Sequence, residues 1–184
     1  ERLSRLSDNL LKLASLESEH HPFHPTTYDL DEQLRRIVVF YEPLWSVKEL
    51  DMDLALPRVK IMADSDQLNQ VWMNVIGNAI KFTPYQGHIH IKIDALRDRV
   101  QIWIHDTGIG IPSDAQARIF DRFYKVDQAR QRGSGSGLGL AITRKIIEMH
   151  HGTIEVHSEV GKGTQFLIVL PTMQTIQAPS KKND

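Results

Sequence analysis

The sequence contains no cysteine, which excludes disulfide bonds and metal sites built on thiolates. It also lacks an apolar run near the ~20 residues that a membrane-spanning helix needs, and no signal peptide is visible. Neither sign of charge is in excess, because 22 basic and 23 acidic residues give a formal net charge of −1. That balance gives no general reason to expect nucleic acid or an anionic membrane as a partner.

What is present suits one domain with an appended helix, since the chain has 184 residues of which 41% are hydrophobic. Because it begins with Glu1, we expect a fragment of a longer protein. Leucines spaced by three and four predict the end of a bundle helix over residues 1–18, and a helix packed on its own domain is the alternative. Two prolines predict a linker over residues 19–28, its histidines solvated rather than metal ligands. We expect the main domain over 29–172 and a disordered tail over 173–184. The spaced leucines are Leu3, Leu6, Leu10 and Leu13.

The helix predicted from Asp64 to Lys81 has one apolar face and one amide-rich face. Side chains of the second face are separated by three, four and seven residues, so they stack on one stripe. They are Gln67, Gln70, Asn74, Asn78 and Lys81. Asparagine inside a helix is worse than alanine by roughly 0.5 kcal/mol, so a functional role competes evenly with an ordinary solvated face. Amide oxygens suit a hard cation such as Mg²⁺, and a lysine suits phosphate.

A strand predicted over residues 100–105, paired in a hairpin with 88–95, ends at a lone carboxylate. Asp106 is followed by Gly108 and Gly110, and glycine lets a backbone approach a flat ligand closely. A carboxylate fixed there can accept a hydrogen bond from an exocyclic amine such as that of adenine. An ordinary turn is the alternative, because Asp-Thr-Gly is common turn chemistry.

Two further segments complete the pattern. The stretch 113–132 predicts a lid anchored by Phe120 and Phe123, because long segments without periodicity inside a domain are usually functional or disordered. Glycines in 133–139 then open a helix that ends near His150 and offer backbone N–H groups to an anion. A flexible glycine linker is the alternative there. A last hairpin is predicted over 153–157 and 164–170.

In this order the segments resemble the ATP-binding catalytic domain of the sensor histidine kinases, in the superfamily of gyrase, the Hsp90 chaperones and MutL. The motifs are Asn74-Val-Ile-Gly-Asn78-Ala-Ile-Lys81, Asp106-Thr-Gly-Ile-Gly110, Phe120-Asp-Arg-Phe123-Tyr-Lys125 and Gly135-Ser-Gly-Leu-Gly139. The resemblance implies an α/β fold, a two-layer sandwich of about three helices on a five-strand mixed sheet (the Bergerat ATP-binding fold), preceded by a bundle helix end. ATP would lie between the helices and the lid.

The resemblance also implies roles for single residues. Asp106 would bind the adenine amine, and Asn78 would be the main Mg²⁺ ligand with Asn74 beside it. Asn74, Lys81 and Lys125 would act in catalysis, Lys81 through phosphate. Lys125 stands where the family often has arginine, so it keeps the charge but loses the bidentate fork. The other nucleotide-binding residues implied are Gly108, Gly110, Gly135, Gly137, Leu138, Gly139 and Thr164.

The amide of Asn74 separates the branches of the superfamily. The gyrase and Hsp90 branches carry a glutamate there that activates water, and an amide cannot take a proton. The resemblance therefore implies transfer of the γ-phosphoryl of Mg-ATP to a histidine on a dimerisation bundle that this fragment lacks.

The same resemblance implies partners and a location. A response regulator would act downstream, the full-length protein would be a homodimer, and no nucleic acid would be bound. The domain would be cytoplasmic, with its parent anchored in the bacterial cell membrane through missing parts. Two alternatives stay open: a serine kinase of the anti-sigma-factor type, and a non-catalytic, ATP-gated interaction module.

Overall fold

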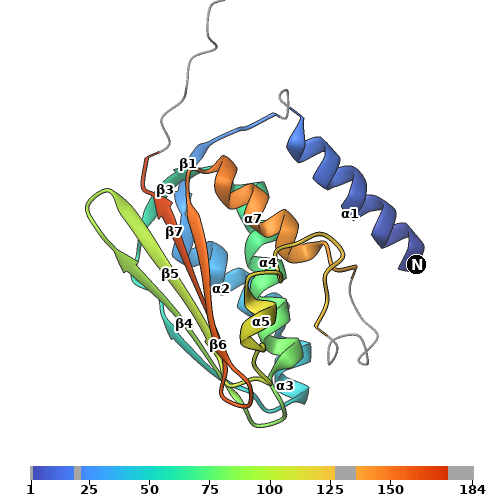
Figure 1. Cartoon of the computed structure of the whole chain (residues 1–184). Helices are drawn as coiled ribbons and strands as arrows, with labels where there is room; N and C mark the ends of the chain where they lie inside the picture. The colour runs from blue at the N-terminus through green and yellow to red at the C-terminus, as the bar shows by residue number, and fades with distance from the viewer. Residues whose placement is uncertain (1, 19–21, 127–135, 174–184) are drawn as a thin grey trace, which may run out of the picture.

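A five-stranded sheet forms one layer of the protein, and helices cover one face of it (Figure 1). The computed structural model describes residues 2–18, 22–126 and 136–173. The strands lie in the order β2 (Asp51–Ala55), β4 (His88–Ala95), β5 (Arg99–Asp106), β7 (Gly163–Pro171) and β6 (Thr153–Glu159). β2 and β4 are parallel and the other pairs are antiparallel, so the predicted mixed sheet is confirmed.

The helices pack on the apolar side chains that alternate along the strands. These helices are α2 (Leu30–Phe40), α3 (Glu42–Val47), α4 (Ser65–Phe82), α5 (Ser113–Gln116) and α7 (Gly139–Met149). The inward residues of β5 are Val100, Ile102 and Ile104, all fully buried, and they meet Trp72 and Ile76 of α4 in the same core. No helix in the described part of the chain is long and apolar enough to cross a membrane.

The start of α4 follows the predicted capping chemistry. The Asp64 side chain accepts a hydrogen bond from the backbone N of Gln67 at 3.1 Å, which satisfies one of the open donors of the first turn. The predicted apolar face of the helix is buried throughout, but Gln67 of the polar stripe is buried as well. Its side chain folds back to Asp64 Oδ2 at 3.1 Å, so the solvated stripe begins later than the spacing predicts.

A second, two-stranded sheet was not predicted. β1 (Thr26–Asp29) pairs antiparallel with β3 (Lys60–Ala63). The sequence of β1, Thr-Thr-Tyr-Asp, shows no alternation of apolar and polar residues. In the structure its first two residues are exposed, and Tyr28 packs on the core with only part of its side chain. Periodicity therefore could not reveal it.

The first helix, α1 (Arg2–Glu17), lies beside α7 (Figure 1). Leu13 and Leu16 are buried there, whereas Leu10 of the leucine seam is 46% exposed. Asn9 Nδ2 donates to Ser136 Oγ at 3.2 Å, just before the first turn of α7. The last turns of α1 thus pack on the domain, and part of the seam stays uncovered.

Candidate functional site

The carboxylate of Asp106 lies at the end of β5, with only 4% of the residue exposed. Its Oδ1 accepts the backbone N–H of Gly108 at 2.8 Å, which fixes the direction of the side chain. Burial raises the pKa of Asp106 to about 6, although backbone hydrogen bonds from Gly108 and Thr164 act in the opposite sense. A nearly buried carboxyl group with a raised pKa is a candidate for a binding site.

Thr164 completes this end of the sheet. It faces Asp106 directly in the β5–β7 register and is 6% exposed. Its hydroxyl lies 2.9 Å from Ser158 Oγ of β6, and Ser158 Oγ also accepts the backbone N–H of Ile111 at 2.8 Å. The loop after Asp106 is therefore tied to both strands of the last hairpin.

α4 contacts the Asp106 loop through its last residue. The backbone N of Ile109 donates to Phe82 O at 3.3 Å, and a Cβ on Gly108 would lie 2.9 Å from the same oxygen. A glycine at 108 allows this close approach, which any side chain would hinder. The same end of α4 carries Lys81, whose ammonium lies 4.6 Å from the centre of the Phe82 ring.

α4 contacts α7 through Asn74. The Asn74 amide nitrogen donates to Gly139 O at 3.1 Å and to Thr143 Oγ1 at 3.3 Å. Because both contacts use the nitrogen, Oδ1 remains the atom with which Asn74 could hold a cation. Asn78 is half-buried one turn further along the same face. α4 thus connects its own motif with two of the other three, the Asp106 loop and the glycine motif that ends at Gly139.

The glycines at 110 and 137 have left-handed backbone conformations, with φ of +73° and +76°. A Cβ on Gly110 would overlap the backbone of Glu159, and one on Gly137 would lie 2.8 Å from the backbone of Phe123. Both positions therefore need glycine for the conformation and for the space. Leu138 directly after is fully buried and anchors the start of α7 in the core.

The lid segment is only partly as predicted. Phe120 packs on the core with its ring 6.5 Å from that of Phe166. The expectation for Phe123 was wrong, because it is 53% exposed with φ of +62°. Lys125 is half-buried, and Gly135 with the second half of the lid lies outside the described residues.

The sequence did not indicate two residues near the site, Gly163 and Gln116. Gly163, treated as part of a hairpin turn, has φ of +114°, and a Cβ there would overlap the backbone oxygen of Asp106. Gln116 Nε2 donates to Ile111 O at 3.0 Å and to Ser158 O at 2.8 Å. Neither residue belongs to a predicted motif. The one sequence feature that pointed to Gly163 was its place just before the strand predicted over 164–170.

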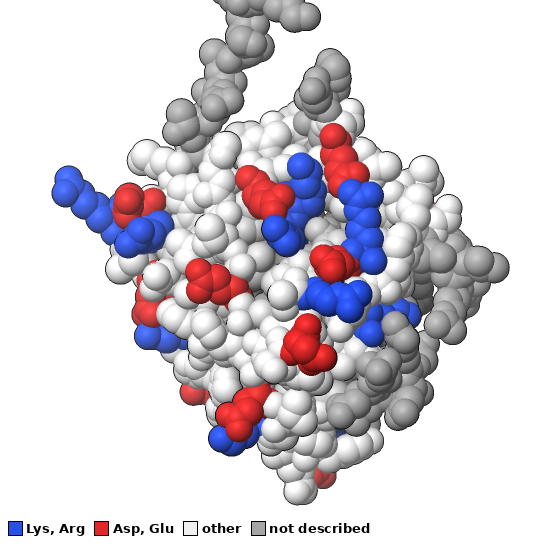
Figure 2. Space-filling model, viewed as in Figure 1, with Lys and Arg blue, Asp and Glu red and all other residues white. Residues whose placement is uncertain are grey.

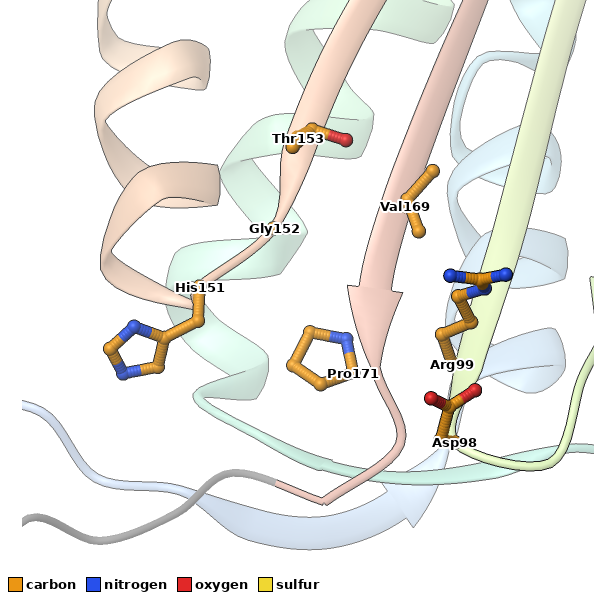
Figure 3. Close-up of a pocket in the computed structure, with 7 residues that line it drawn as sticks. All are labelled: Asp98, Arg99, His151, Gly152, Thr153, Val169 and Pro171. Carbon is orange, nitrogen blue, oxygen red and sulfur yellow. The ribbon is translucent and has the colours of Figure 1, made fainter.

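A surface depression of about 250 Å³ lies at the other end of the same strands (Figure 3). It is lined by Asp98, Arg99, His151, Gly152, Thr153, Val169 and Pro171. Arg99 pairs with Pro171 in the register, seven residues from the Asp106–Thr164 pair. This depression therefore does not belong to the site described above. On the face seen in Figure 2, basic and acidic side chains of the described residues are interspersed.

A two-layer α/β sandwich with a glycine-flanked carboxylate at the end of a central strand, and an amide-bearing helix beside it, defines the class of Bergerat-fold domains. The family model described as histidine kinase-, DNA gyrase B- and HSP90-like ATPase matches residues 63–174. The chain belongs to this family. The predicted likeness to the catalytic domain of sensor histidine kinases is also confirmed.

The relatives agree with this assignment. The sensor protein kinase WalK of Staphylococcus epidermidis is 39% identical over 176 residues, which cover 93% of this chain and 28% of that protein. WalK of Staphylococcus aureus is 38% identical, with 93% of this chain and 42% of the relative covered. The chain therefore spans less than half the length of these relatives.

Solved structures show the same fold. Full-length ShkA in complex with AMPPNP superposes with a TM-score of 0.81 and 32% identity, over 96% of this chain and 37% of that one. The histidine kinase ThkA in complex with the response regulator TrrA gives 0.77 and 26%, over 95% and 49%. The mycobacterial sensor histidine kinase MprB gives 0.73 and 25%, over 83% of this chain and all of that one.

Proposed function

We propose that this chain binds ATP with Mg²⁺ and transfers the γ-phosphoryl group to a histidine on the dimerisation bundle of its parent protein. The observation that carries the proposal is the position of α4. Through Phe82 it contacts the Asp106 loop, and through Asn74 it contacts the start of α7. Segments far apart in the sequence thus form one site with an adenine end and a phosphate end.

At the adenine end, the Asp106 carboxylate would accept the exocyclic amine. The carboxylate is nearly buried, and in such surroundings a hydrogen bond to an ionised acceptor is stronger than in water. Gly108 and Gly110 let the loop after Asp106 pack closely against the backbone of Phe82 and Glu159, and this packing would hold the carboxylate beside the base. Thr164, opposite Asp106, would line the same pocket.

At the phosphate end, the donor set fits a magnesium ion that is shared with a triphosphate. Mg²⁺ is usually held by one or two protein oxygens together with substrate phosphates and water. Asn78 and the Oδ1 of Asn74 would supply the protein oxygens, since the Asn74 nitrogen is already bound to α7. Bound magnesium would neutralise phosphate charge. Lys81 and the backbone N–H groups of residues 137–139 would contact the phosphates, and Lys125 would approach from the lid.

The proposed reaction is phosphoryl transfer rather than hydrolysis. The bond from the γ-phosphorus to the β,γ-bridging oxygen breaks, a P–N bond forms to an imidazole nitrogen, ADP leaves, and the imidazole N–H proton passes to solvent. An amide at position 74 cannot act as a base toward water, so the site waits for a supplied nucleophile. Positioning and charge neutralisation then supply the catalysis.

The relatives and neighbours support the partners of this reaction. The WalK proteins are named sensor protein kinases, and ThkA was solved with a response regulator. We therefore propose a response regulator as the downstream acceptor, a homodimeric parent and an anchored sensor of which this chain is the cytoplasmic catalytic part.

The test supplies the chain with radiolabelled ATP, Mg²⁺ and a separately expressed dimerisation bundle of a relative. Acid-labile, base-stable label on the bundle is expected. A parallel reaction contains an anti-anti-sigma substrate in place of the bundle, and acid-stable label there would instead indicate a serine kinase. Nucleotide binding without transfer to either substrate would indicate an interaction module. Asn78→Ala should abolish transfer, whereas Gln70→Ala, an amide two turns earlier on α4, should leave it within about twofold of wild type.

A further inference from the structure

The two residues that flank α3 both reach the backbone of α4. Tyr41 is the N-cap of α3, and its hydroxyl donates to Met73 O at 2.9 Å. Lys48 is the C-cap of α3, and its ammonium donates to the carbonyl oxygens of Ile80, Lys81 and Thr83 at 2.8, 3.0 and 2.7 Å. α3 lies beside the lower end of α4 (Figure 1). The stretch of α4 held between these two contacts is the one that carries Asn74 and Asn78.

The contacts of Lys48 satisfy groups that the chain cannot satisfy locally. The last carbonyl groups of a helix have no partner inside it, and here the chain continues through Pro84, which has no N–H for Ile80 O. Three residues donate to the carbonyl groups of this last turn: Thr83 N and Oγ1 to Ala79, Lys48 Nζ to Ile80 and Lys81, and Ile109 N to Phe82. Lys48 therefore binds two of the last four carbonyl groups of α4.

The ammonium also acts on the charge of this end. The carbonyl end of a helix carries a partial negative charge, equivalent to roughly half an elementary charge. On the proposed function, this end lies beside the subsite for a polyanionic triphosphate, because Lys81 is in the same turn and Asn78 in the preceding one. Uncapped carbonyls would repel the phosphates, and the three donors of one ammonium cancel that effect.

We infer that Lys48 is a positioning residue for the nucleotide site. It does not touch the nucleotide; its ammonium holds the last turn of α4, which presents Lys81 to the proposed phosphate subsite. Tyr41 does the same at the other end of the stretch, where its hydroxyl also fills the space beside Gly77. This inference rests on the proposed function, and it adds two residues outside every motif of the site.

The test measures the affinity of the purified chain for AMPPNP with Mg²⁺ and for adenosine, which has no phosphates. Lys48→Met keeps the length of the side chain and removes the ammonium. It should raise the Kd for AMPPNP about tenfold and the Kd for adenosine less than threefold. Lys48→Arg should recover most of the lost affinity, because a guanidinium can also donate to several carbonyls. Lys60→Met is the matched control, since that lysine is exposed on β3 and pairs only weakly with Asp29 at 3.6 Å.

Circular dichroism at the temperature of the titration separates folding from positioning. If Lys48→Met does not fold, Tyr41→Phe removes only a hydroxyl and should raise the Kd for AMPPNP two- to threefold. The inference is overturned if the folded variants bind AMPPNP as wild type does, or if both ligands weaken by the same factor. Wild type that fails to bind AMPPNP would contradict the proposed function itself, before any variant is compared.

Discussion

The two walls of the proposed nucleotide site are built differently. The first, the α4–β5 wall, consists of α4 and residues 106–110, and neighbouring elements bind backbone groups in the middle and at the C-terminal end of α4. The second, the lid wall, consists of residues 120–126 and 136–139. There Phe123 is half exposed, and its backbone N donates to Gly137 O at 2.9 Å. On the proposed function, contacts within the protein thus fix the adenine end, whereas the phosphate end is bordered by a segment in which Phe123 is half exposed.

The largest expected effect breaks the α4–β5 wall. Gly163→Ala places a methyl group on the backbone oxygen of Asp106 at a φ of +114°, so the strand pair must separate. We expect the free energy of unfolding to fall by more than about 3 kcal/mol. Urea denaturation checks this value. Gly161→Ala in the same turn is the control, because nothing lies within 4 Å of a Cβ there, and an equal loss in both variants would contradict the account.

The pH dependence of the free energy of unfolding tests the α4–β5 wall further, because it reports on the buried carboxyl group of Asp106. The pKa of Asp106 is raised from 3.8 to about 6 in the folded state. The folded protein then binds more protons than the unfolded chain between these values, so this contribution to stability is present below pH 4 and is lost as the pH rises through 6. The loss amounts to as much as about 3 kcal/mol.

The measurement compares urea unfolding of wild type and Asp106→Asn from pH 4 to 7. Subtracting the two series removes the effect of the other carboxylates. Wild type should lose stability relative to the variant as the pH rises. A difference that stays constant over this range would show that Asp106 is ionised throughout, which would contradict a raised pKa for this carboxyl.

Nucleotide binding should show the opposite trend with pH. The ionised carboxylate accepts a much stronger hydrogen bond from the adenine amine than the neutral acid does, so the Kd for AMPPNP should rise by up to about tenfold from pH 7 to pH 5. Asp106→Asn, titrated in parallel, corrects for protonation of the ligand itself. The excess weakening in wild type is the quantity of interest, and it must vanish if Asp106 is remote from the base.

The smallest effect is expected on the lid wall. Phe123→Ala should change the free energy of unfolding by less than about 0.5 kcal/mol, because the side chain is 53% exposed. Phe120→Ala, its partner in the same motif, should cost about 2 kcal/mol, since its ring packs on the core near Phe166. Thermal unfolding distinguishes the two. Equal losses would mean that Phe123 packs as its partner does.

Much of this molecule could be predicted from its sequence, for reasons that differ between the walls. The hairpin ending at Asp106 has strict alternation, and α4 has an apolar stripe and an aspartate cap, so both elements followed from local pattern. The strand β1 could not be predicted, because it pairs with β3 in a separate two-stranded sheet and none of its side chains is fully buried. Phe123 was predicted to be an anchor because it shares a motif with Phe120, but its positive φ turns it outward.

The contacts that fix the site were harder to foresee than its residues. Lys48 directly follows the short helix α3, and no spacing in the sequence connects it to the end of α4. Its role depends on the missing N–H of Pro84 and on the path of α3, which brings it to three carbonyl groups. Gly163 likewise depends on the closeness of the β5 and β7 backbones, a property of the folded sheet. The motifs therefore indicate the residues of the proposed site, and only the packing shows which contacts hold them.

The central claim is that the Asp106 carboxylate selects adenine. Isothermal titration of the chain with AMPPNP and with GMPPNP, both with Mg²⁺, tests it directly, because guanine presents a carbonyl oxygen where adenine presents an amine. Wild type should prefer AMPPNP strongly, and Asp106→Asn should weaken AMPPNP by about 2 kcal/mol while narrowing that preference, since its amide can donate to the guanine oxygen. Equal binding of the two nucleotides by wild type, or a preference unchanged in Asp106→Asn, would contradict the account.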